Sequence, residues 1–235
     1  MTAWFVRSAE TALFLEPVTV QLEEPTLGVA RAAMDAVMRG PSSAEGLETL
    51  APPGTEVLGV DRDGALLTVD LSEEVRTPVG GAAGETAFAQ QLAWTGTQFE
   101  GVEGVRLLVG GTAVEELWGH LDWSLPVTRD DFALSPVIIE EPESGAEITS
   151  GSVTASGTAN VFEATLIVRL LRPDGSLAEE AVVTASCGTG CRGTWEQAFA
   201  SLEMPGEWVI EAEETDPSDG EGRPPFLARV RFQVQ

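Results

Sequence analysis

The stretch "GTANVFEATLIVRLL", Gly157–Leu171, decides how the second half of the chain is interpreted. Apolar side chains stand at every second position, at Phe162, Ala164, Leu166, Val168 and Leu170. Such alternation is the pattern of a half-buried β-strand, whose successive side chains point to opposite faces. We therefore expect a core strand in which Phe162 is buried and Glu163 points to the other face.

Asn160 and Glu163 lie beside this run and allow two interpretations. In the first, Asn160 hydrogen-bonds the backbone of a turn that leads into the strand, because short amide side chains bond locally. Glu163 is then an exposed strand residue. In the second interpretation, both side chains face a ligand. The pattern favours a scaffold, and the two residues are kept as candidates for ligand contact.

The second half as a whole, residues 136–235, has the pattern of an all-β fold. Short apolar runs are separated by the turn sequences "EPESG", "RPDGS", "CGTGC", "MPGE" and "DPSDGEGRPP". Six or seven strands at this spacing predict a β-sandwich. The last turn holds Asp216, Asp219 and Glu221, whose carboxylates make them weak calcium candidates. They fail the EF-hand spacing, so we expect a solvated turn and no metal.

Cys187 and Cys191 flank the three small residues of "CGTGC". A turn this short brings its flanking positions within reach of each other, which predicts a disulfide. Two free thiols are one alternative. Half of a zinc site is another, although His120 is the only other good soft ligand and structural zinc takes four. A disulfide favours a protein that works outside the cytoplasm.

The first half alternates strand and helix signals in the order β-β-α-β-β-α-β. This order predicts an α/β (α+β) domain with one mixed sheet and two main helices packed on a face. Around "LWGHLDWSLPVTRDDFALSP" the periodicity fades and acidic residues appear with prolines. We therefore expect a first domain at 1–124, a linker at 125–135, and the sandwich domain at 136–235.

The two helices are predicted from apolar residues at helical spacing. The first helix has its stripe at Ala30, Ala33, Met34 and Val37. It is expected to stop at Gly40. The second helix is expected from about Glu85 to Phe99, with Gly96 inside it. A glycine there is expected to cost about 1 kcal/mol relative to alanine and to loosen the helix.

The composition excludes several classes of function. The net charge is −25, and all thirteen basic residues are arginines scattered singly, so we expect no binding to nucleic acid or to an anionic membrane surface. The sequence has no run of about 18 apolar residues, so no segment is expected to span a bilayer. No signal peptide is visible, which fits a cytosolic protein or a chain whose export segment has been removed.

Catalytic and cofactor motifs are also missing from the sequence. His120 is the single histidine, and no nucleophile elbow accompanies it. The glycines of "PVGGAAGE" lack a following Lys and Ser/Thr, so they predict no phosphate loop. Acidic residues are numerous enough to leave a glycosidase site open, but the six tryptophans are dispersed. We expect a protein that is not an enzyme, with no catalytic residues and no cofactor.

Five segments stand in a characteristic order along the first half. They are "RGP" at 39–41, "PPGTEV" at 52–57, "VDLSEE" at 69–74, "FAQQLAWTGTQF" at 88–99 and "GVEGVRLLVGG" at 101–111. In these segments the chain resembles the GerMN domain of sporulation and spore germination proteins. Trp4-Phe5 departs from this resemblance, because a tyrosine–aromatic pair is commoner there, and so does Gly96, where a larger residue is expected.

Two further segments lie in the second half. They are "IIEEPESGAEITS" at 138–150 and "VTASGTANVFEATLIVRL" at 153–170. Through them the second half resembles the immunoglobulin-like domain of bacterial spore germination proteins. The resemblance implies an immunoglobulin-like sandwich, and it carries no established catalytic residues onto this chain.

For the whole chain, the resemblance implies a non-enzymatic binding or assembly protein of the bacterial cell envelope. Such domains typically sit outside the membrane, often on a lipid-anchored precursor. The expected partners are therefore envelope proteins. The expected location is extracytoplasmic, on a lipoprotein whose export segment is absent from this chain. The alternative is an envelope polysaccharide-binding module or a cell-wall hydrolase.

Overall fold

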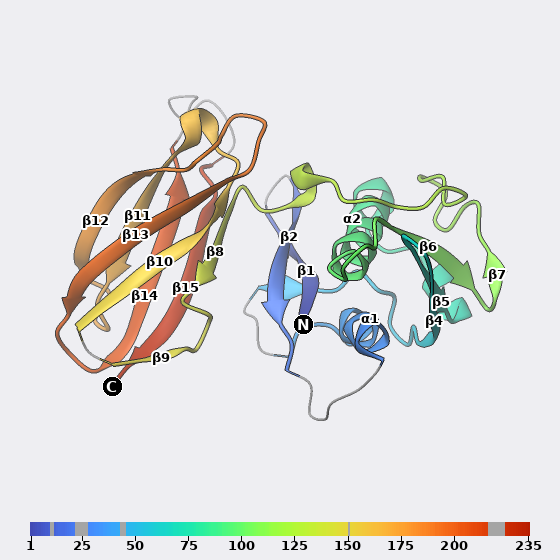
Figure 1. Ribbon diagram of the computed structural model, residues 1–235, viewed down its shortest axis with the longest axis horizontal. Helices are drawn as coiled ribbons and strands as arrows, with labels where there is room; N and C mark the ends of the chain where they lie inside the picture. Colours follow the sequence, from blue (N-terminus) through green and yellow to red (C-terminus); the bar gives the residue numbers. More distant parts are fainter. Residues whose placement is uncertain (10–11, 22–27, 43–45, 150, 216–223) are drawn as a thin grey trace. The chain divides into compact units, whose positions relative to one another are not determined.

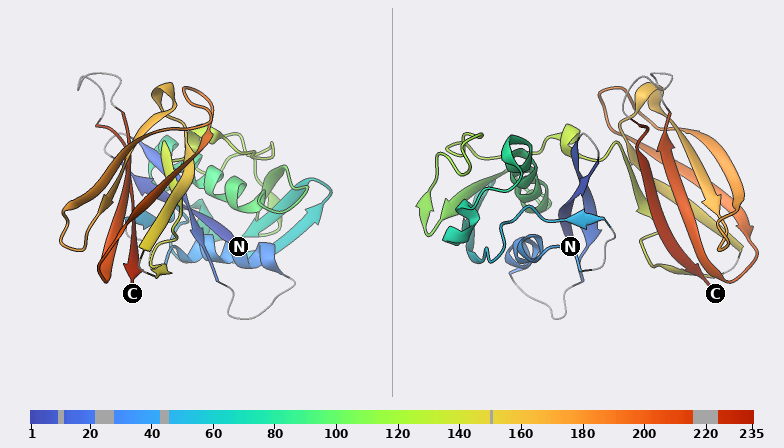
Figure 2. Two further views of the ribbon diagram at one scale, coloured as in Figure 1. Left: turned by 60° about the vertical axis from the view of Figure 1, so that its left-hand side comes forward. Right: turned by 180° about the vertical axis from the view of Figure 1, so that it is seen from behind.

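The computed structural model describes residues 1–9, 12–21, 28–42, 46–149, 151–215 and 224–235. The chain divides into two compact units, Met1–Leu134 and Ser135–Gln235, which are drawn in Figures 1 and 2. The first is an α/β unit with two main helices and mixed pairing, and the second is all β, so the predicted fold class is confirmed. The boundaries at 124 and 136, with a linker between them, stay a prediction.

The first unit contains two α-helices, two short 3-10 helices and seven strands within its described residues. They are β1 (Thr2–Ser8), β2 (Leu13–Thr19), α1 (Val29–Arg39), β3 (Leu47–Glu48), β4 (Val57–Asp63), β5 (Leu66–Leu71), η1 (Glu73–Arg76), α2 (Gly81–Gly96), β6 (Gly104–Val109), β7 (Thr112–Ala113) and η2 (Asp131–Ala133). No described helix combines the length and the hydropathy needed to cross a membrane.

The strands of this unit form two sheets, and the expectation of one mixed sheet is wrong. One sheet has the order β2-β1-β3 and is antiparallel, whereas the other has the order β4-β5-β6-β7. In the second sheet only the β5–β6 pair is parallel. Both helices lie between the two sheets (Figure 1), since each packs against strands of both. The β-β-α order along the sequence does not distinguish one sheet from two, because both give the same local pattern.

The first helix agrees with its predicted stripe. Ala33, Met34 and Val37 are fully buried on α1. Gly40 ends the helix at a φ of 83°, and its N–H donates to the carbonyl oxygens of Ala36 and Val37. A positive φ is accessible to glycine without steric cost, so the sequence ends the helix where Gly40 occurs.

The second helix, α2, is buried on nearly all sides. It packs against β1 and β2 on one side and against β6 on the other. It starts at Gly81 and ends at Gly96, so it is shifted towards the N-terminus from the predicted range of Glu85 to Phe99. A helix between two sheets has to be apolar or hydrogen-bonded on all sides, which explains why several of its buried residues are polar.

Polar side chains in the second half of α2 and just beyond its end hydrogen-bond the backbone of β1 where no described strand pairs with it. The N–H of Thr2 donates to Oε1 of Gln98 at 2.9 Å, and the carbonyl oxygen of Thr2 accepts from Nε2 of Gln98 at 2.6 Å. The N–H of Trp4 donates to the Thr95 hydroxyl at 3.1 Å, and its carbonyl accepts from the Gln91 amide at 3.0 Å. These side chains pair the backbone groups that a further strand would otherwise bond, as buried backbone requires.

Residues 128–130 are held on α2 in the same way. The Gln90 side chain donates to the carbonyl of Thr128 at 3.1 Å and accepts from the N–H of Asp130 at 2.9 Å. The guanidinium of Arg129 lies 4.5 Å from the ring centroid of Trp94, a cation–π distance. Burial lowers the pKa of Arg129, while the Coulomb field of Asp131 acts in the opposite direction. This part of the predicted linker therefore packs on the first unit.

Gly96 has a packing role that its helix propensity does not suggest. A Cβ at this position would lie 2.5 Å from Cγ2 of Val105, 3.0 Å from Cε of Met34 and 3.1 Å from Cδ2 of Leu67. The loosening of the helix by Gly96 stays a prediction, but the close contacts show a second effect of the glycine. The missing side chain lets α2 approach α1 and the β5–β6 pair closely.

Over its described residues, 135–149, 151–215 and 224–235, the second unit is all β apart from one short 3-10 helix. Its elements are β8 (Val137–Glu141), β9 (Glu147–Ile148), β10 (Gly151–Ala159), η3 (Phe162–Ala164), β11 (Thr165–Leu171), β12 (Leu177–Thr184), β13 (Gly193–Leu202), β14 (Gly206–Glu214) and β15 (Leu227–Val234). They form one sheet of order β13-β10-β8 and another of order β12-β11-β14-β15-β9. All pairs are antiparallel except β15–β9.

The strand that the alternation predicts begins later than expected. Leu166, Val168 and Leu170 are fully buried on β11, so this part of the prediction is confirmed. The burial of Phe162 is wrong, because Phe162 lies in η3 and is 46% exposed. Val161 is buried instead. The backbone turns at η3 before the strand begins, and this turn moves Phe162 out of the alternating series.

Candidate functional site

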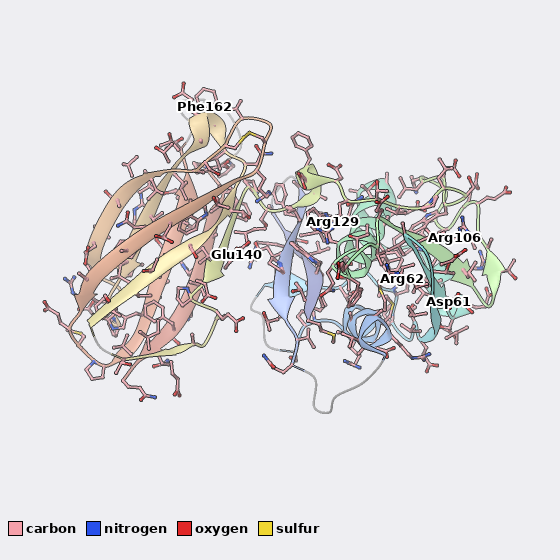
Figure 3. The ribbon with its side chains drawn as sticks, in the orientation of Figure 1. Asp61, Arg62, Arg106, Arg129, Glu140 and Phe162 are labelled. Carbon is pink, nitrogen blue, oxygen red and sulfur yellow. A yellow bond between two sulfur atoms is a disulfide. The ribbon has the colours of Figure 1, made fainter. Side chains whose placement is uncertain are left out.

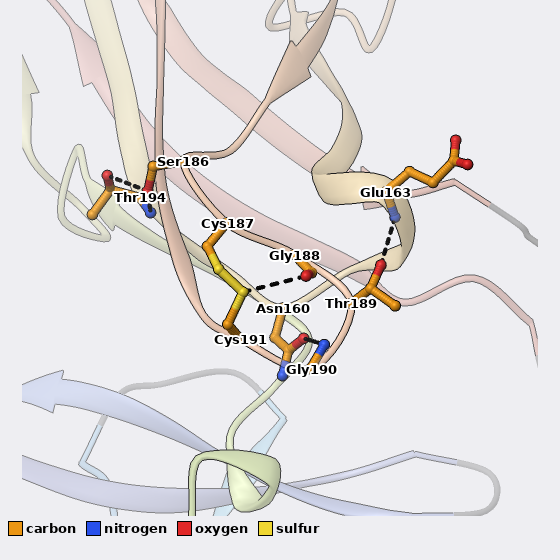
Figure 4. Close-up of a disulfide and its surroundings, with 9 residues drawn as sticks. All are labelled: Asn160, Glu163, Ser186, Cys187, Gly188, Thr189, Gly190, Cys191 and Thr194. Carbon is orange, nitrogen blue, oxygen red and sulfur yellow. Dashed lines mark hydrogen bonds between the residues drawn. A yellow bond between two sulfur atoms is a disulfide. The ribbon is translucent and has the colours of Figure 1, made fainter.

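The tip of the sandwich, residues 160–164 and 185–191, brings together two segments that lie far apart in the sequence. The side chain of Asn160 accepts a hydrogen bond from the N–H of Gly190 at 2.9 Å. The hydroxyl of Thr189 accepts from the N–H of Glu163, also at 2.9 Å. Both bonds are drawn in Figure 4. The N–H of Thr189 donates to the carbonyl oxygen of Val161 at 2.9 Å and adds a third connection.

A disulfide between Cys187 and Cys191 closes the loop on the β13 side of the tip, with its Cα atoms 5.8 Å apart (Figure 4). Two glycines allow the loop to pack this closely. A Cβ on Gly188 would lie 2.4 Å from Cα of Ala164, and a Cβ on Gly193 would lie 2.2 Å from the backbone nitrogen of Cys187. A larger residue at 188 would push the loop away from η3, and one at 193 would clash with the backbone of Cys187.

The backbone of the tip is strained. Among the described residues, the non-glycine residues with positive φ are Glu163 at 52°, Ala164 at 56° and Thr189 at 53°. All three belong to the tip. Such conformations cost of order 1–3 kcal/mol each and persist where the surrounding structure holds them. The hydrogen bonds and the disulfide provide that support, so the tip is a rigid surface.

The structure brings together four of the residues singled out from the sequence. Asn160, Cys187 and Cys191 hold the loops of the tip together through a hydrogen bond and a disulfide. The carboxylate of Glu163 points away from the loops (Figure 4). The calcium candidates Asp216, Asp219 and Glu221 lie outside the described residues. Of the two candidates for ligand contact, Glu163 is exposed, whereas the Asn160 side chain bonds the backbone of the neighbouring loop.

Phe162 is the residue that sequence reasoning missed at the tip. It stands at one end of the sandwich (Figure 3). The alternating pattern counts it as core because the pattern assumes extended backbone throughout. The positive φ values of Glu163 and Ala164 break that assumption, and neither residue type signals them.

A second polar cluster lies in the first unit around Glu85, whose side chain is fully buried on α2. Its carboxylate accepts from the N–H of Trp118 at 3.0 Å, from the N–H of His120 at 2.8 Å and from the indole of Trp123 at 2.7 Å. The ring Nδ1 of His120 lies 3.2 Å away. Sequence analysis did not single out Glu85, although its position in an apolar helical segment was a signal.

The hydrogen bonds decide the protonation state of Glu85. Burial alone would raise the pKa of this carboxyl, but the bonds from Trp118, Trp123 and His120 outweigh it and lower the pKa. Glu85 is therefore ionised at neutral pH and has no proton to donate. Its chemistry is that of an anchor for the segment that carries the two tryptophans, not that of a general acid.

The first unit also has a groove of about 800 Å³. Its lining includes Arg31, Asp35, Met38, Arg39, Glu56 and Val57. Two of the segments that carry the GerMN resemblance contribute to it. Arg31 donates to the carbonyl oxygens of Val57 and Leu58 and lies 3.8 Å from Asp35. Because Arg31 serves the fold and the remaining charges are of both signs, the groove defines no class of ligand.

An α/β domain followed by a β-sandwich defines the architectural class of this protein. Comparison with family models identifies the two parts. Residues 3–115 match the Germane family, described as sporulation and spore germination. Residues 136–221 match the Gmad2 family, described as the immunoglobulin-like domain of bacterial spore germination. The chain therefore contains a GerMN (Germane) domain followed by a Gmad2 immunoglobulin-like domain.

Solved structures with similar folds include the tandem GerMN domains of the sporulation protein GerM from Bacillus subtilis. That match has 20% identity and a TM-score of 0.47, and it covers 55% of this chain and 45% of the tandem. The first GerMN domain of the same protein matches at 18% identity and a TM-score of 0.45, over 56% of this chain and 98% of that domain. The chain thus spans less than half of the tandem structure. Comparison with curated proteins gave no match.

Proposed function

We propose that this chain is a non-enzymatic binding and assembly protein of the bacterial cell envelope. The observation that carries the proposal is the sandwich tip, where strained backbone, a disulfide and close glycine packing hold an exposed aromatic side chain in place. A rigid surface of this kind loses little conformational entropy on binding and needs no catalytic group. The GerMN and Gmad2 families, which concern sporulation and germination, agree with such a role.

The proposed location is extracytoplasmic, on a lipid-anchored precursor. The Cys187–Cys191 disulfide supports it, because disulfides persist in oxidising compartments. The proposed partners are envelope proteins. The net charge of −25 favours neutral or basic protein surfaces over nucleic acid.

The alternative, a polysaccharide-binding module or wall hydrolase, has less support. Such a site needs a cleft that is lined by several accessible aromatic rings and holds a pair of close carboxylates. Five of the six tryptophans, Trp94, Trp118, Trp123, Trp195 and Trp208, are at most 7% exposed. The deeply buried Glu85 carboxylate is held by structural hydrogen bonds. Attachment of wall polymer to the chain is therefore an outcome that a test in native cells has to detect.

The absence of lysine offers a direct test, because amine-reactive crosslinkers find no side-chain amine in the natural sequence. Arg106→Lys on the first unit and Arg172→Lys on the second each introduce one amine without changing the charge. Crosslinking in native cells, followed by mass spectrometry, is expected to recover the same one or two envelope proteins with at least one of these variants. The lysine-free parent chain is the background control. Recovery of wall fragments, or of nothing above this background, would overturn the proposal.

A further inference from the structure

We infer that the tip is a plug: Phe162 enters an apolar pocket on a partner protein, and Glu163 meets an arginine or lysine at the rim of that pocket. The inference rests on the proposed function and names the surface and the chemistry of the contact. It is carried by the exposure of Phe162, the rigidity of η3 and the charge of Glu163, which are three separate observations.

Phe162 is exposed although buried residues stand on both sides of it in the sequence. Its neighbour Val161 is 2% exposed and Leu166 is fully buried, so the chain enters the core immediately before and after η3. Phe162 alone among these three is turned outward, with 46% of its surface exposed. Covering an aromatic ring is favourable and aromatic residues are enriched in interfaces, so a pocket on a partner would complete the burial that the fold leaves unfinished.

The rigidity of η3 makes Phe162 an effective anchor. The residues that follow it, Glu163 and Ala164, have positive φ. The N–H of Glu163 is bonded to Thr189, and the carbonyl of Ala164 accepts from the N–H of Ala185 at 2.8 Å. The backbone that carries Phe162 is therefore held in place before any partner arrives. Preorganisation of this kind lowers the entropy lost on binding.

The charge of Glu163 selects the partner. Its side chain is exposed, and among the described residues no cation forms an ion pair with it. The whole chain is strongly acidic, which opposes an anionic lipid surface and a second copy of the chain. A basic rim on a partner protein is complementary to this surface, and complementary charge raises both specificity and the rate of association.

The test places a photoreactive aromatic side chain at the tip of the full chain in native cells. In the variant Phe162→benzoylphenylalanine the probe is the benzophenone itself. The matched control is Leu177→benzoylphenylalanine, because Leu177 is 49% exposed and starts β12 at the opposite end of β11 from η3. We expect at least about tenfold more protein adduct from position 162 than from position 177, as for a central aromatic anchor. The adduct should map to apolar residues beside Arg or Lys.

Two substitutions separate the aromatic from the charge. Phe162→Ala is expected to lower about tenfold the amount of the same protein that copurifies with the chain from native cells. Glu163→Asn, which tolerates the positive φ and removes the charge, is expected to lower it about threefold and to reduce its salt dependence. Glu163→Asp retains the charge and should change little. Circular dichroism and the urea midpoint of each variant show that the sandwich is still folded.

The outcomes distinguish this inference from the proposed function. The inference about Phe162 would be overturned if the adducts at position 162 contain lipid or wall polymer. It would also be overturned if positions 162 and 177 give equal amounts of protein adduct. If the single-lysine variants still recover envelope proteins in that case, the binding role stands and its surface lies elsewhere. If neither approach recovers a protein, both proposals fail.

Discussion

The centre of α2 and the tip of the sandwich both reverse the usual distribution of polar and apolar side chains. In α2 the polar residues Glu85, Gln90 and Gln91 are buried. At the tip, the apolar Phe162 is exposed and its neighbours have strained backbone. The buried polar groups of α2 all have hydrogen-bond partners, whereas the Phe162 ring lacks a complete apolar environment.

This difference distinguishes a residue that stabilises the fold from one that is available for binding. A buried polar side chain with every bond made stabilises one arrangement of the chain, and removing it leaves its partners unpaired. An exposed aromatic on a rigid turn adds little to stability and is free to contact another molecule. Substitutions in α2 should therefore change the free energy of unfolding, and substitutions at Phe162 should change binding.

The largest effect is expected from Glu85→Ala. The change leaves the N–H groups of Trp118 and His120 and the indole of Trp123 without their acceptor, so we expect a loss of about 3 kcal/mol in the free energy of unfolding. Urea denaturation measures it, with hydrogen exchange assigning each transition to its domain. His120→Ala is the matched control, because this ring is partly exposed and makes one long contact; we expect a change below about 1 kcal/mol. A loss below 1 kcal/mol for Glu85→Ala would contradict the anchoring role.

The next effect tests the tip. Replacing both Cys187 and Cys191 by serine opens a very short loop, and the chain-entropy estimate for such a loop is about 2 kcal/mol. We expect faster hydrogen exchange in residues 160–164 and 185–191, with the first unit unchanged. Thiol titration of the natively exported protein without reductant is expected to find no free thiol. Two titratable thiols there would argue against the bond and against the proposed location.

A smaller effect distinguishes packing from helix propensity at Gly96. Alanine is the better helix former by about 1 kcal/mol. The close contacts of a Cβ with Val105 and Met34 oppose that gain, so we expect Gly96→Ala to destabilise the chain by about 1 kcal/mol. The double variant with Val105→Ala should cost less than the sum of the two single changes. Stabilisation by Gly96→Ala alone would show that the helix has room to move.

The smallest effect is the acid dependence of stability. The pKa of Glu85 in the folded chain lies below its ordinary value of 4.5. The ionised carboxylate therefore adds stability at pH values above the unfolded pKa, and this contribution is lost as the pH falls through the lower, folded pKa. Glu85→Gln should lack this component below about pH 4.5. Parallel stability curves for the two chains across the acid range would exclude it.

Much of the fold was predictable because it depends on local patterns. The stripe of Ala33, Met34 and Val37 placed α1, and the alternation from Leu166 to Leu170 placed β11. The short turn between the cysteines placed them opposite each other. These patterns repeat every two or every three to four residues, so a single segment contains all the information needed to recognise them.

The candidate site was predictable only in part. The sequence singled out Asn160, Glu163 and the cysteines one by one, but their meeting at one tip depends on how β10 and β13 pair. Phe162 was assigned to the core, since nothing in "VFEAT" signals a turn with positive φ. The role of Glu85 has no local signal, because the three groups that donate to its carboxylate lie more than thirty residues away in the chain.

The sequence by itself determined the two-part architecture, the main helices and strands, the strong negative charge and the relationship to the GerMN and Gmad2 families. The tertiary structure alone decided that the first unit has two sheets, that Gly96 is needed for close packing and that Phe162 faces outward. The physical reason is the range of the interactions. Periodicity and turn chemistry act over a few neighbouring residues, whereas burial and hydrogen-bond partners depend on segments that only folding brings together.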